Sequence, residues 1–107
     1  MDLAEPVATY YRAIDDGDYE ALSDVLASEF VQYRPDRTFE GRESFVQFMR
    51  EDRPNPDTSH ELDATFCGDD GPAVRGRVVD GDEELVRFVD VFVLEDGQVQ
   101  ELETYTR

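Results

Sequence analysis

An acidic residue interrupts an apolar stretch near the C-terminal end of the chain. Asp90 lies two residues from both Phe88 and Phe92, and valines occupy the alternating positions 89, 91 and 93. Because successive side chains of a strand point to opposite faces, Asp90 shares a face with the two phenylalanines. Desolvating a carboxylate is costly, so the position indicates either a polar task inside the fold or a carboxylate satisfied by a neighbouring strand or a helix dipole.

Few other residue types in the chain could build a reactive centre. His60 is the only imidazole, and it is either a mobile acid–base group or an exposed loop residue. Cys67 stands alone, which excludes an intramolecular disulfide and a paired-thiol motif. One histidine and one cysteine do not make a zinc cluster, and no nucleophile motif surrounds the serines. We therefore expect neither a metal nor a cofactor.

The charge balance limits the classes of partner. The 107 residues include 27 acidic and 10 basic side chains, a formal net charge of −17, and every basic residue is an arginine. This balance predicts adaptation to high salt, where a Debye length of roughly 3 Å at 1 M screens the surface carboxylates from one another. An acidic surface that captures a basic partner is the alternative, but no clustered run supports it. Nucleic-acid binding is not expected, because no basic face is available.

The elements that must position these residues follow from periodicity. Apolar residues at helical spacing predict helices over 2–15 and 42–50, and a second helix that Asp18 caps and that carries Leu22 and Leu26. Further on, the chain is strand-like, and turns rich in Asp and Gly separate its strands. The strands are predicted over 30–34, 61–67, 73–79, 84–94 and 98–106. The loop 52–59, with its two prolines, separates the helical part of the chain from the strand-like part. This order predicts an α+β domain with three N-terminal helices on one face of a curved, mostly antiparallel sheet.

The other face of such a sheet has no element left to cover it. The alternating valines at 89, 91 and 93 therefore suggest a homodimer packed sheet to sheet, unless strand twist and the long loop cover them. No apolar run approaches the length of a membrane span, and the N-terminus lacks a basic segment followed by an apolar one. We expect a cytoplasmic protein without membrane contact.

Three stretches together resemble a known superfamily. They are Tyr11-Arg-Ala-Ile-Asp-Asp-Gly-Asp-Tyr-Glu-Ala-Leu22, Phe39-Glu-Gly-Arg-Glu-Ser-Phe45 and Val89-Asp-Val-Phe-Val-Leu-Glu-Asp-Gly-Gln-Val99. In this order they are similar to the cone-shaped nuclear-transport-factor-2-like superfamily, which includes SnoaL-like polyketide cyclases and ketosteroid isomerases. The resemblance covers nearly the whole chain and implies one SnoaL-like domain over 1–107, with a pocket between sheet and helices for a small apolar or partly polar molecule. It does not fix a reaction.

The resemblance to ketosteroid isomerase implies roles for three residues. Asp90 matches an aspartate that stays protonated and donates a hydrogen bond to a developing oxyanion, and Tyr10 matches its tyrosine partner, although Tyr11 competes for the same helical face. Arg34, which precedes Pro35, matches the position of the general base, where an arginine cannot abstract a proton. The isomerase reaction itself is therefore not expected. Whether Arg34 reaches Asp90 decides between a hydrogen-bond donor and an ion pair.

Two other catalysts of the superfamily, the SnoaL-like cyclases and the epoxide hydrolases, put acidic residues on the later strands and also fit only in part. The epoxide hydrolases combine an Arg-x-Asp pair with a late aspartate, whereas this chain has Arg75-Gly-Arg77 and Glu103-Thr-Tyr105. The sequence leaves three hypotheses open. The first is a ligand-binding protein, which as an enzyme would be a cofactor-free isomerase, cyclase or lyase. The second is a non-catalytic dimerisation or ligand-sensing module, and the third is a scaffold without a pocket. The predicted catalytic residues are Asp90 and Tyr10, and the predicted ligand-binding residues are Arg34, Phe48, His60, Phe92 and Tyr105.

Overall fold

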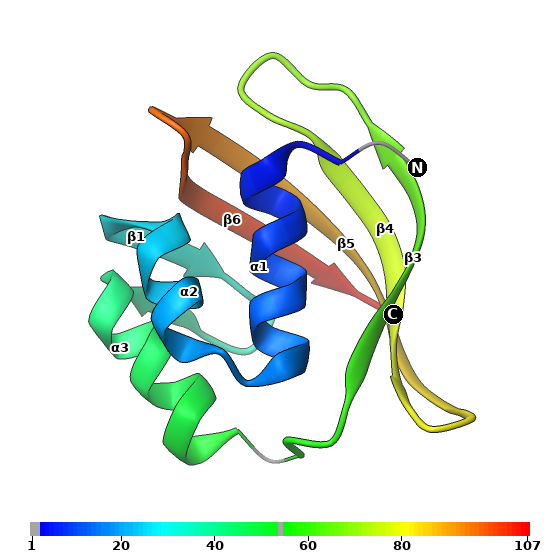
Figure 1. The fold of residues 1–107 in the computed structure, drawn as a ribbon. Helices are drawn as coiled ribbons and strands as arrows, with labels where there is room; N and C mark the ends of the chain where they lie inside the picture. Colours follow the sequence, from blue (N-terminus) through cyan, green and yellow to red (C-terminus); the bar gives the residue numbers. More distant parts are fainter. Residues whose placement is uncertain (1–2, 54) are drawn as a thin grey trace.

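The fold places three helices on one side of a curved sheet (Figure 1). The computed structural model describes residues 3–53 and 55–107, so the predicted helix start at Asp2 and the first loop proline, Pro54, lie outside the described residues. The helices are α1 (Glu5–Asp16), α2 (Tyr19–Val25) and α3 (Arg42–Gln47), which continues as a short π-helix, η1 (Phe48–Asp52). The strands are β1 (Leu26–Tyr33), β2 (Thr38–Glu40), β3 (Ser59–Phe66), β4 (Ala73–Asp80), β5 (Glu83–Glu95) and β6 (Gln98–Thr106).

The described strands form one six-stranded sheet in the order β2-β1-β6-β5-β4-β3. β1 and β6 are parallel, whereas the other neighbours are antiparallel. The predicted α+β architecture is confirmed, with two differences. Leu26 begins β1 instead of lying in the second helix, and β2 was not predicted, because alternation over three residues is too short to be recognised.

The sequence explains where α1 begins and ends. Pro6 occupies its first turn, where a missing N–H costs nothing. Gly17 ends the helix in the left-handed conformation, with φ of 70°, and Asp18 then caps α2 by accepting a hydrogen bond from the Ala21 N–H at 3.1 Å. This tight turn folds α2 back beside α1.

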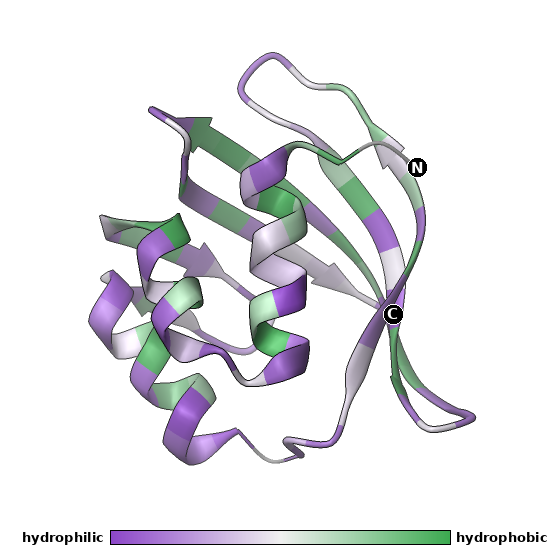
Figure 2. Cartoon of the chain, in the orientation of Figure 1, coloured by the Kyte–Doolittle hydropathy of each residue, from purple (hydrophilic) through white to green (hydrophobic). Residues whose placement is uncertain are grey.

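The core lies between the helices and the concave face of the sheet. Its largest fully buried side chains come from both layers: Ile14, Leu22, Leu26, Phe30, Phe45, Phe92, Val99 and Leu102. Figure 2 shows hydrophobic and hydrophilic residues alternating along the strands, as expected for a sheet with one covered face. Phe88, Asp90 and Phe92 face the helices and are buried, whereas Val91 is exposed on the outer face. The predicted inward direction of Asp90 is thus observed.

No helix in the described ranges has both the length and the apolar character needed to cross a membrane.

Candidate functional site

A cavity of about 420 Å³ lies between the helices and the sheet. Helix α1 contributes Tyr10 and Ile14, and the π-helix contributes Phe48 and Met49. The sheet and the loops provide the remaining walls, among them Gln32, Arg34, Phe88, Asp90, Thr104 and His60. The interior is therefore hollow beside Asp90, which argues against a scaffold without a pocket.

Asp90 is held by two hydroxyl groups. Its Oδ2 accepts a hydrogen bond from the Tyr11 hydroxyl at 2.7 Å, and its Oδ1 accepts one from Thr104 Oγ1 at 2.6 Å. Thr104 lies directly opposite Asp90 in the antiparallel pair β5–β6, which places both side chains on the concave face. Gln32 Nε2 in turn donates to Thr104 Oγ1 at 3.0 Å, so a polar chain crosses from β1 to α1 beneath the cavity.

The surroundings of Asp90 favour its neutral form. Burial raises the pKa of the carboxyl group, and the hydrogen bonds from Thr104 and Tyr11 only partly oppose this rise. His60 and Arg34 lower the pKa through weaker charge interactions. Desolvation is therefore the dominant effect on Asp90, as its place among Phe88 and Phe92 suggests.

His60 forms a short pair with an acidic residue that the sequence reading did not select. Its Nδ1 lies 2.6 Å from Asp15 Oδ1, and its backbone N–H donates to Asp15 Oδ2 at 3.1 Å. An ionised carboxylate only accepts, so Nδ1 donates to Asp15, and Nε2 is the ring nitrogen that is not bonded to Asp15. The side chains of His60 and Asp15 are 16% and 22% exposed, so His60 is a partly buried strand residue rather than an exposed loop residue.

Tyr10 and Tyr11 have different partners although they are adjacent. The Tyr11 hydroxyl is engaged by Asp90, and its ring packs near the rings of His60 and Phe88. Tyr10 lines the cavity, and none of the described residues hydrogen-bonds its hydroxyl. Burial raises the pKa of Tyr10 well above its ordinary value, with the nearby Asp90 carboxylate adding to the rise. Tyr10 therefore keeps its proton and offers a hydrogen-bond donor.

Arg34 lines the cavity but does not pair directly with Asp90. Within the described ranges, its nearest carboxylate is that of Asp36, with Nε 3.9 Å from Oδ1. The carboxyl oxygens of Asp90 are bonded to Tyr11 and Thr104 instead. The question that the sequence left open is thus answered in favour of a hydrogen-bonded carboxyl group over an ion pair.

The structure places the three predicted aromatic ligand residues differently. Phe48 lines the cavity. Phe92 is 1% exposed and packs behind the cavity against the edges of Tyr10 and Tyr11, in the core. Tyr105 is 53% exposed on the outer face of the sheet, because it alternates with the inward-facing Thr104. The cavity thus includes Phe48 and leaves out Phe92 and Tyr105.

Several residues of the site were missed from the sequence. For Asp15 one signal was available, since it lies four residues after Tyr11 and a helix brings such positions to one face. For Gln32 and Thr104 there was none, because polar residues in strands are common and only the register brings these two together. Within the described ranges, no group of three or more His, Cys, Asp or Glu residues is arranged to hold a metal ion.

Several solved structures share this fold. A candidate polyketide cyclase from Sinorhizobium meliloti has a TM-score of 0.86 at 21% identity, covering 98% of this chain and 97% of its own. A candidate ketosteroid isomerase from Kribbella flavida has a TM-score of 0.85 at 19% identity, and the match covers 97% of this chain and 76% of that one. An LEH-like epoxide hydrolase from M. tuberculosis has a TM-score of 0.78 at 13% identity, and the match covers 97% of this chain and 81% of that one. At these identities the likeness defines the fold, which is that of a nuclear-transport-factor-2-like α+β protein.

The sequence places the chain within this class more closely. The family model of the SnoaL-like domain matches residues 7–102, which is most of the chain. The protein belongs to the SnoaL-like domain family. No curated protein matches it in sequence.

Proposed function

We propose that this protein binds a small organic molecule in the 420 Å³ cavity and catalyses a cofactor-free proton transfer on it, of isomerase or lyase type. The Asp15–His60 pair carries this proposal, because it supplies an oriented base at the wall of the cavity. Tyr10 supplies a free hydroxyl in the same cavity. A base and a hydrogen-bond donor are the two groups that enolisation of a carbonyl compound requires.

The chemistry uses the ring nitrogen that faces away from Asp15. His60 Nε2 takes a proton from the carbon next to the substrate carbonyl, and the electron pair of that C–H bond moves to the carbonyl oxygen. The Tyr10 hydroxyl donates a hydrogen bond to this developing enolate oxygen. An isomerase then returns the proton from His60 to a more distant carbon, whereas a lyase gives it to a group that leaves from the β-carbon. In both reactions the proton that His60 removes is passed on, either to a carbon of the substrate or to the leaving group.

In this proposal Asp90 acts close to the reacting groups without being the base. Both of its oxygens are engaged, and its bond to Tyr11 fixes the ring that packs near His60. Asp90 and Thr104 therefore keep Tyr11 and the cavity wall in place.

Deuterium exchange tests the base without requiring the natural substrate. Propiophenone and 3-benzoylpropionate both carry exchangeable hydrogens next to a ketone, and NMR in D₂O follows their loss. The wild-type protein is expected to accelerate exchange on at least one probe. His60→Gln and Asp15→Asn should slow that exchange, His60→Gln by at least about a hundredfold, because positioned general bases contribute on that order.

Arg12→Gln is the matched control, since Arg12 lies on the exposed side of α1 and, among the residues that the structure describes, pairs with Asp16 and Asp18 alone. It is expected to exchange both ketones at the wild-type rate. The assignment of His60 as the base would be wrong if the wild-type protein exchanged the probes no faster than buffer does. It would also be wrong if His60→Gln exchanged them at the wild-type rate.

The second candidate is a non-catalytic ligand-sensing module. It is favoured by the polar chain Gln32–Thr104–Asp90–Tyr11, because these side chains bond to one another as they would in a structural network. This candidate predicts that ligands bind in the cavity and that no exchange follows. Mass spectrometry of molecules that co-purify with the protein would then identify the ligand.

We also propose that two copies pack through the outer face of the sheet in a high-salt cytoplasm. The apolar residues exposed on that face support this arrangement, since Val91 and Tyr105 are 36% and 53% exposed on neighbouring strands. The excess of acidic residues supports the high-salt setting.

A further inference from the structure

Positive charge gathers in the lining of the cavity although the chain is strongly acidic. Three of the ten basic residues, Arg34, Arg37 and Arg53, line the cavity. Its lining contains two acidic residues, Asp36 and Asp90, and Asp90 is already bonded to two hydroxyl groups. The cavity therefore carries an excess of positive charge in a protein of net charge −17.

The local structure holds two of these arginines in place. The Arg34 N–H donates to the Arg37 carbonyl at 2.9 Å, which closes the turn between β1 and β2. The Arg37 guanidinium lies 4.9 Å from the centre of the Phe48 ring and 5.5 Å from that of Phe39, and Arg34 lies 5.9 Å from Phe39. Stacking on aromatic faces leaves the N–H edges of a guanidinium free to bind other groups.

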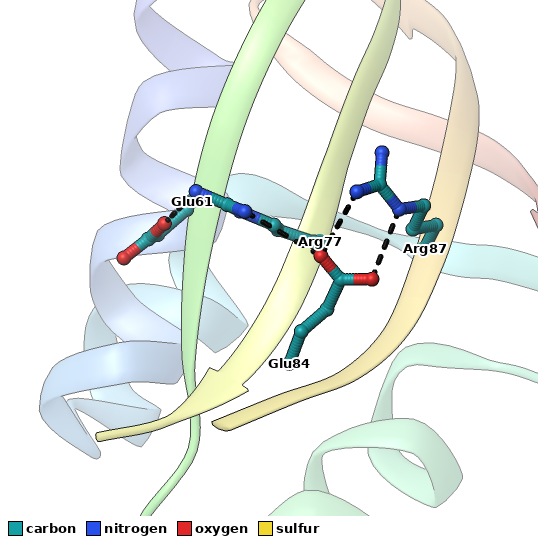
Figure 3. Close-up of polar contacts among 4 residues, drawn as sticks. All are labelled: Glu61, Arg77, Glu84 and Arg87. Carbon is teal, nitrogen blue, oxygen red and sulfur yellow. Dashed lines mark hydrogen bonds and ion pairs between the residues drawn. The ribbon is translucent and has the colours of Figure 1, made fainter. Parts of the chain in front are cut away.

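These arginines are weakly neutralised by the protein itself. Arg34 and Arg37 share one carboxylate, that of Asp36, at 3.9 and 3.7 Å, and the Asp36 side chain is 67% exposed. Arg53 donates to the Pro56 carbonyl at 3.0 Å, its buried Nε has no hydrogen-bond partner, and no carboxylate of the described ranges pairs with it. Two arginines of the outer face, Arg77 and Arg87, are paired more closely. Figure 3 shows Arg77 and Arg87 there, bonded to Glu61 and Glu84 at 2.7 and 2.9 Å.

We infer that the arginines lining the cavity bind an oxyanion of the ligand, so that the molecule taken up is an organic acid with an apolar body and a carboxylate or phosphate group. A planar guanidinium fork matches both oxyanions. Phe45, Phe48, Met49 and Phe88 offer the apolar wall for the body. The inference rests on the proposed function only in taking this cavity as the ligand site.

The test compares probes that share one apolar body. The probes are 2-naphthoate, methyl 2-naphthoate and 2-naphthyl phosphate, and titration calorimetry at about 1 M salt measures their affinities, since charges within a cavity are screened less than surface charges. At least one anion is expected to bind about tenfold more tightly than the neutral ester. Tighter binding of the naphthoate assigns a carboxylate, and tighter binding of the naphthyl phosphate assigns a phosphate.

Variants of the arginines locate the effect. Arg34→Gln and Arg53→Gln should each weaken the preferred anion by about threefold to thirtyfold and leave the ester unchanged, because a partly exposed charge pair is lost. Arg34→Lys, which keeps the charge and loses the fork, should retain part of the affinity. Arg12→Gln removes the same charge from the exposed side of α1 and should leave all three affinities unchanged. If Arg53→Gln fails to fold, Arg34→Gln and Arg34→Lys still test whether an arginine of the cavity binds the anion.

Equal affinity for the anions and the ester, or anion binding that Arg34→Gln and Arg53→Gln leave intact, would overturn the inference. The absence of binding by all three probes would overturn it together with the ligand site. Failure of the proposed catalysis is a separate result, because it shows as a lack of deuterium exchange on ketones while the preference for anions persists.

Discussion

Tyr10 and Tyr11 show how neighbouring residues of one helix receive different tasks. Tyr11 donates to the buried Asp90 carboxyl group, 79 positions away in sequence. Tyr10 is also buried but lines the cavity without a described hydrogen-bond partner for its hydroxyl. The first is a structural contact of the polar chain, and the second is a donor that can serve a ligand.

Removing the hydroxyl of Tyr11 should therefore affect stability, and removing that of Tyr10 should affect catalysis. Tyr11→Phe leaves Asp90 Oδ2 without its donor and is expected to lower the free energy of unfolding by about 1–3 kcal/mol. Tyr10→Phe should change stability by less than about 1 kcal/mol and slow deuterium exchange on the ketone probes. Urea unfolding and NMR exchange measure the two effects. A larger loss of stability in Tyr10→Phe than in Tyr11→Phe would contradict these assignments.

Asp90 gives stability a specific dependence on pH. Because burial raises its pKa in the folded state, the folded protein holds a proton there that the unfolded chain has released. The associated stability is complete below the ordinary aspartate pKa of about 4 and is lost as pH rises through the raised value.

The variant Asp90→Asn removes this titration. The free energy of unfolding of wild type minus that of Asp90→Asn is therefore expected to fall as pH increases from about 4 through the raised pKa of Asp90. Urea unfolding at several pH values measures the difference. Asp82→Asn, in the exposed turn between β4 and β5, is the control and should show no such slope. A difference for Asp90→Asn that does not vary with pH would show that its pKa is not raised.

At the scale of elements, β4 depends on a residue without a side chain. Gly76 pairs with Leu62 of β3 and Phe88 of β5. A Cβ atom built there would lie 2.5 Å from the Glu61 carbonyl oxygen and 2.9 Å from Phe88 Cζ. The absent side chain thus lets Phe88 lie over β4 and form part of the cavity wall.

Gly76→Ala should force Phe88 or β3 to move. We expect a loss of about 1–3 kcal/mol in the free energy of unfolding, as for other insertions into packed regions, together with weaker binding of 2-naphthoate. Urea unfolding and calorimetry measure the two effects. A variant with wild-type stability and affinity would mean that the strands accommodate a methyl group at this point without cost.

At the scale of the whole molecule, the outer face of the sheet is the surface that the chain leaves uncovered. Val91 and Tyr105 are exposed on this face, which also carries the arginine–glutamate network of Figure 3. An apolar strip bordered by paired charges fits a second copy of the same face, because the arginines and glutamates of one copy can meet those of the other.

Sedimentation equilibrium at about 1 M salt is expected to give the mass of a dimer. Val91→Arg should shift the distribution to the monomer, because it places a charge within the apolar strip. Ala8→Arg adds the same charge on the exposed side of α1 and should leave the dimer intact. A monomeric wild-type mass at micromolar concentration would remove the proposed interface.

Residue patterns predicted much of the architecture because they depend on short-range geometry. Helical spacing in 2–15 and alternation around Asp90 identified α1, β5 and the inward direction of the carboxylate. Pocket residues were predicted less completely. Tyr10, Arg34, Phe48, His60 and Asp90 line the cavity, whereas Phe92 lies in the core and Tyr105 on the outer face. The outward direction of Tyr105 depends on the pairing of β6, which alternation of a single strand does not specify.

The sequence by itself determined the order of elements, the fold class and the acidic surface, since each follows from local spacing or from composition. Only the tertiary structure decided the partners. Asp15 and His60, 45 positions apart, form a hydrogen-bonded pair, and Asp90 accepts a hydrogen bond from Tyr11. Arginines from two separate loops line one cavity. The physical reason is that hydrogen bonds and charge pairs act over a few ångströms. Strand register and helix packing, which arise from the whole chain, set those separations.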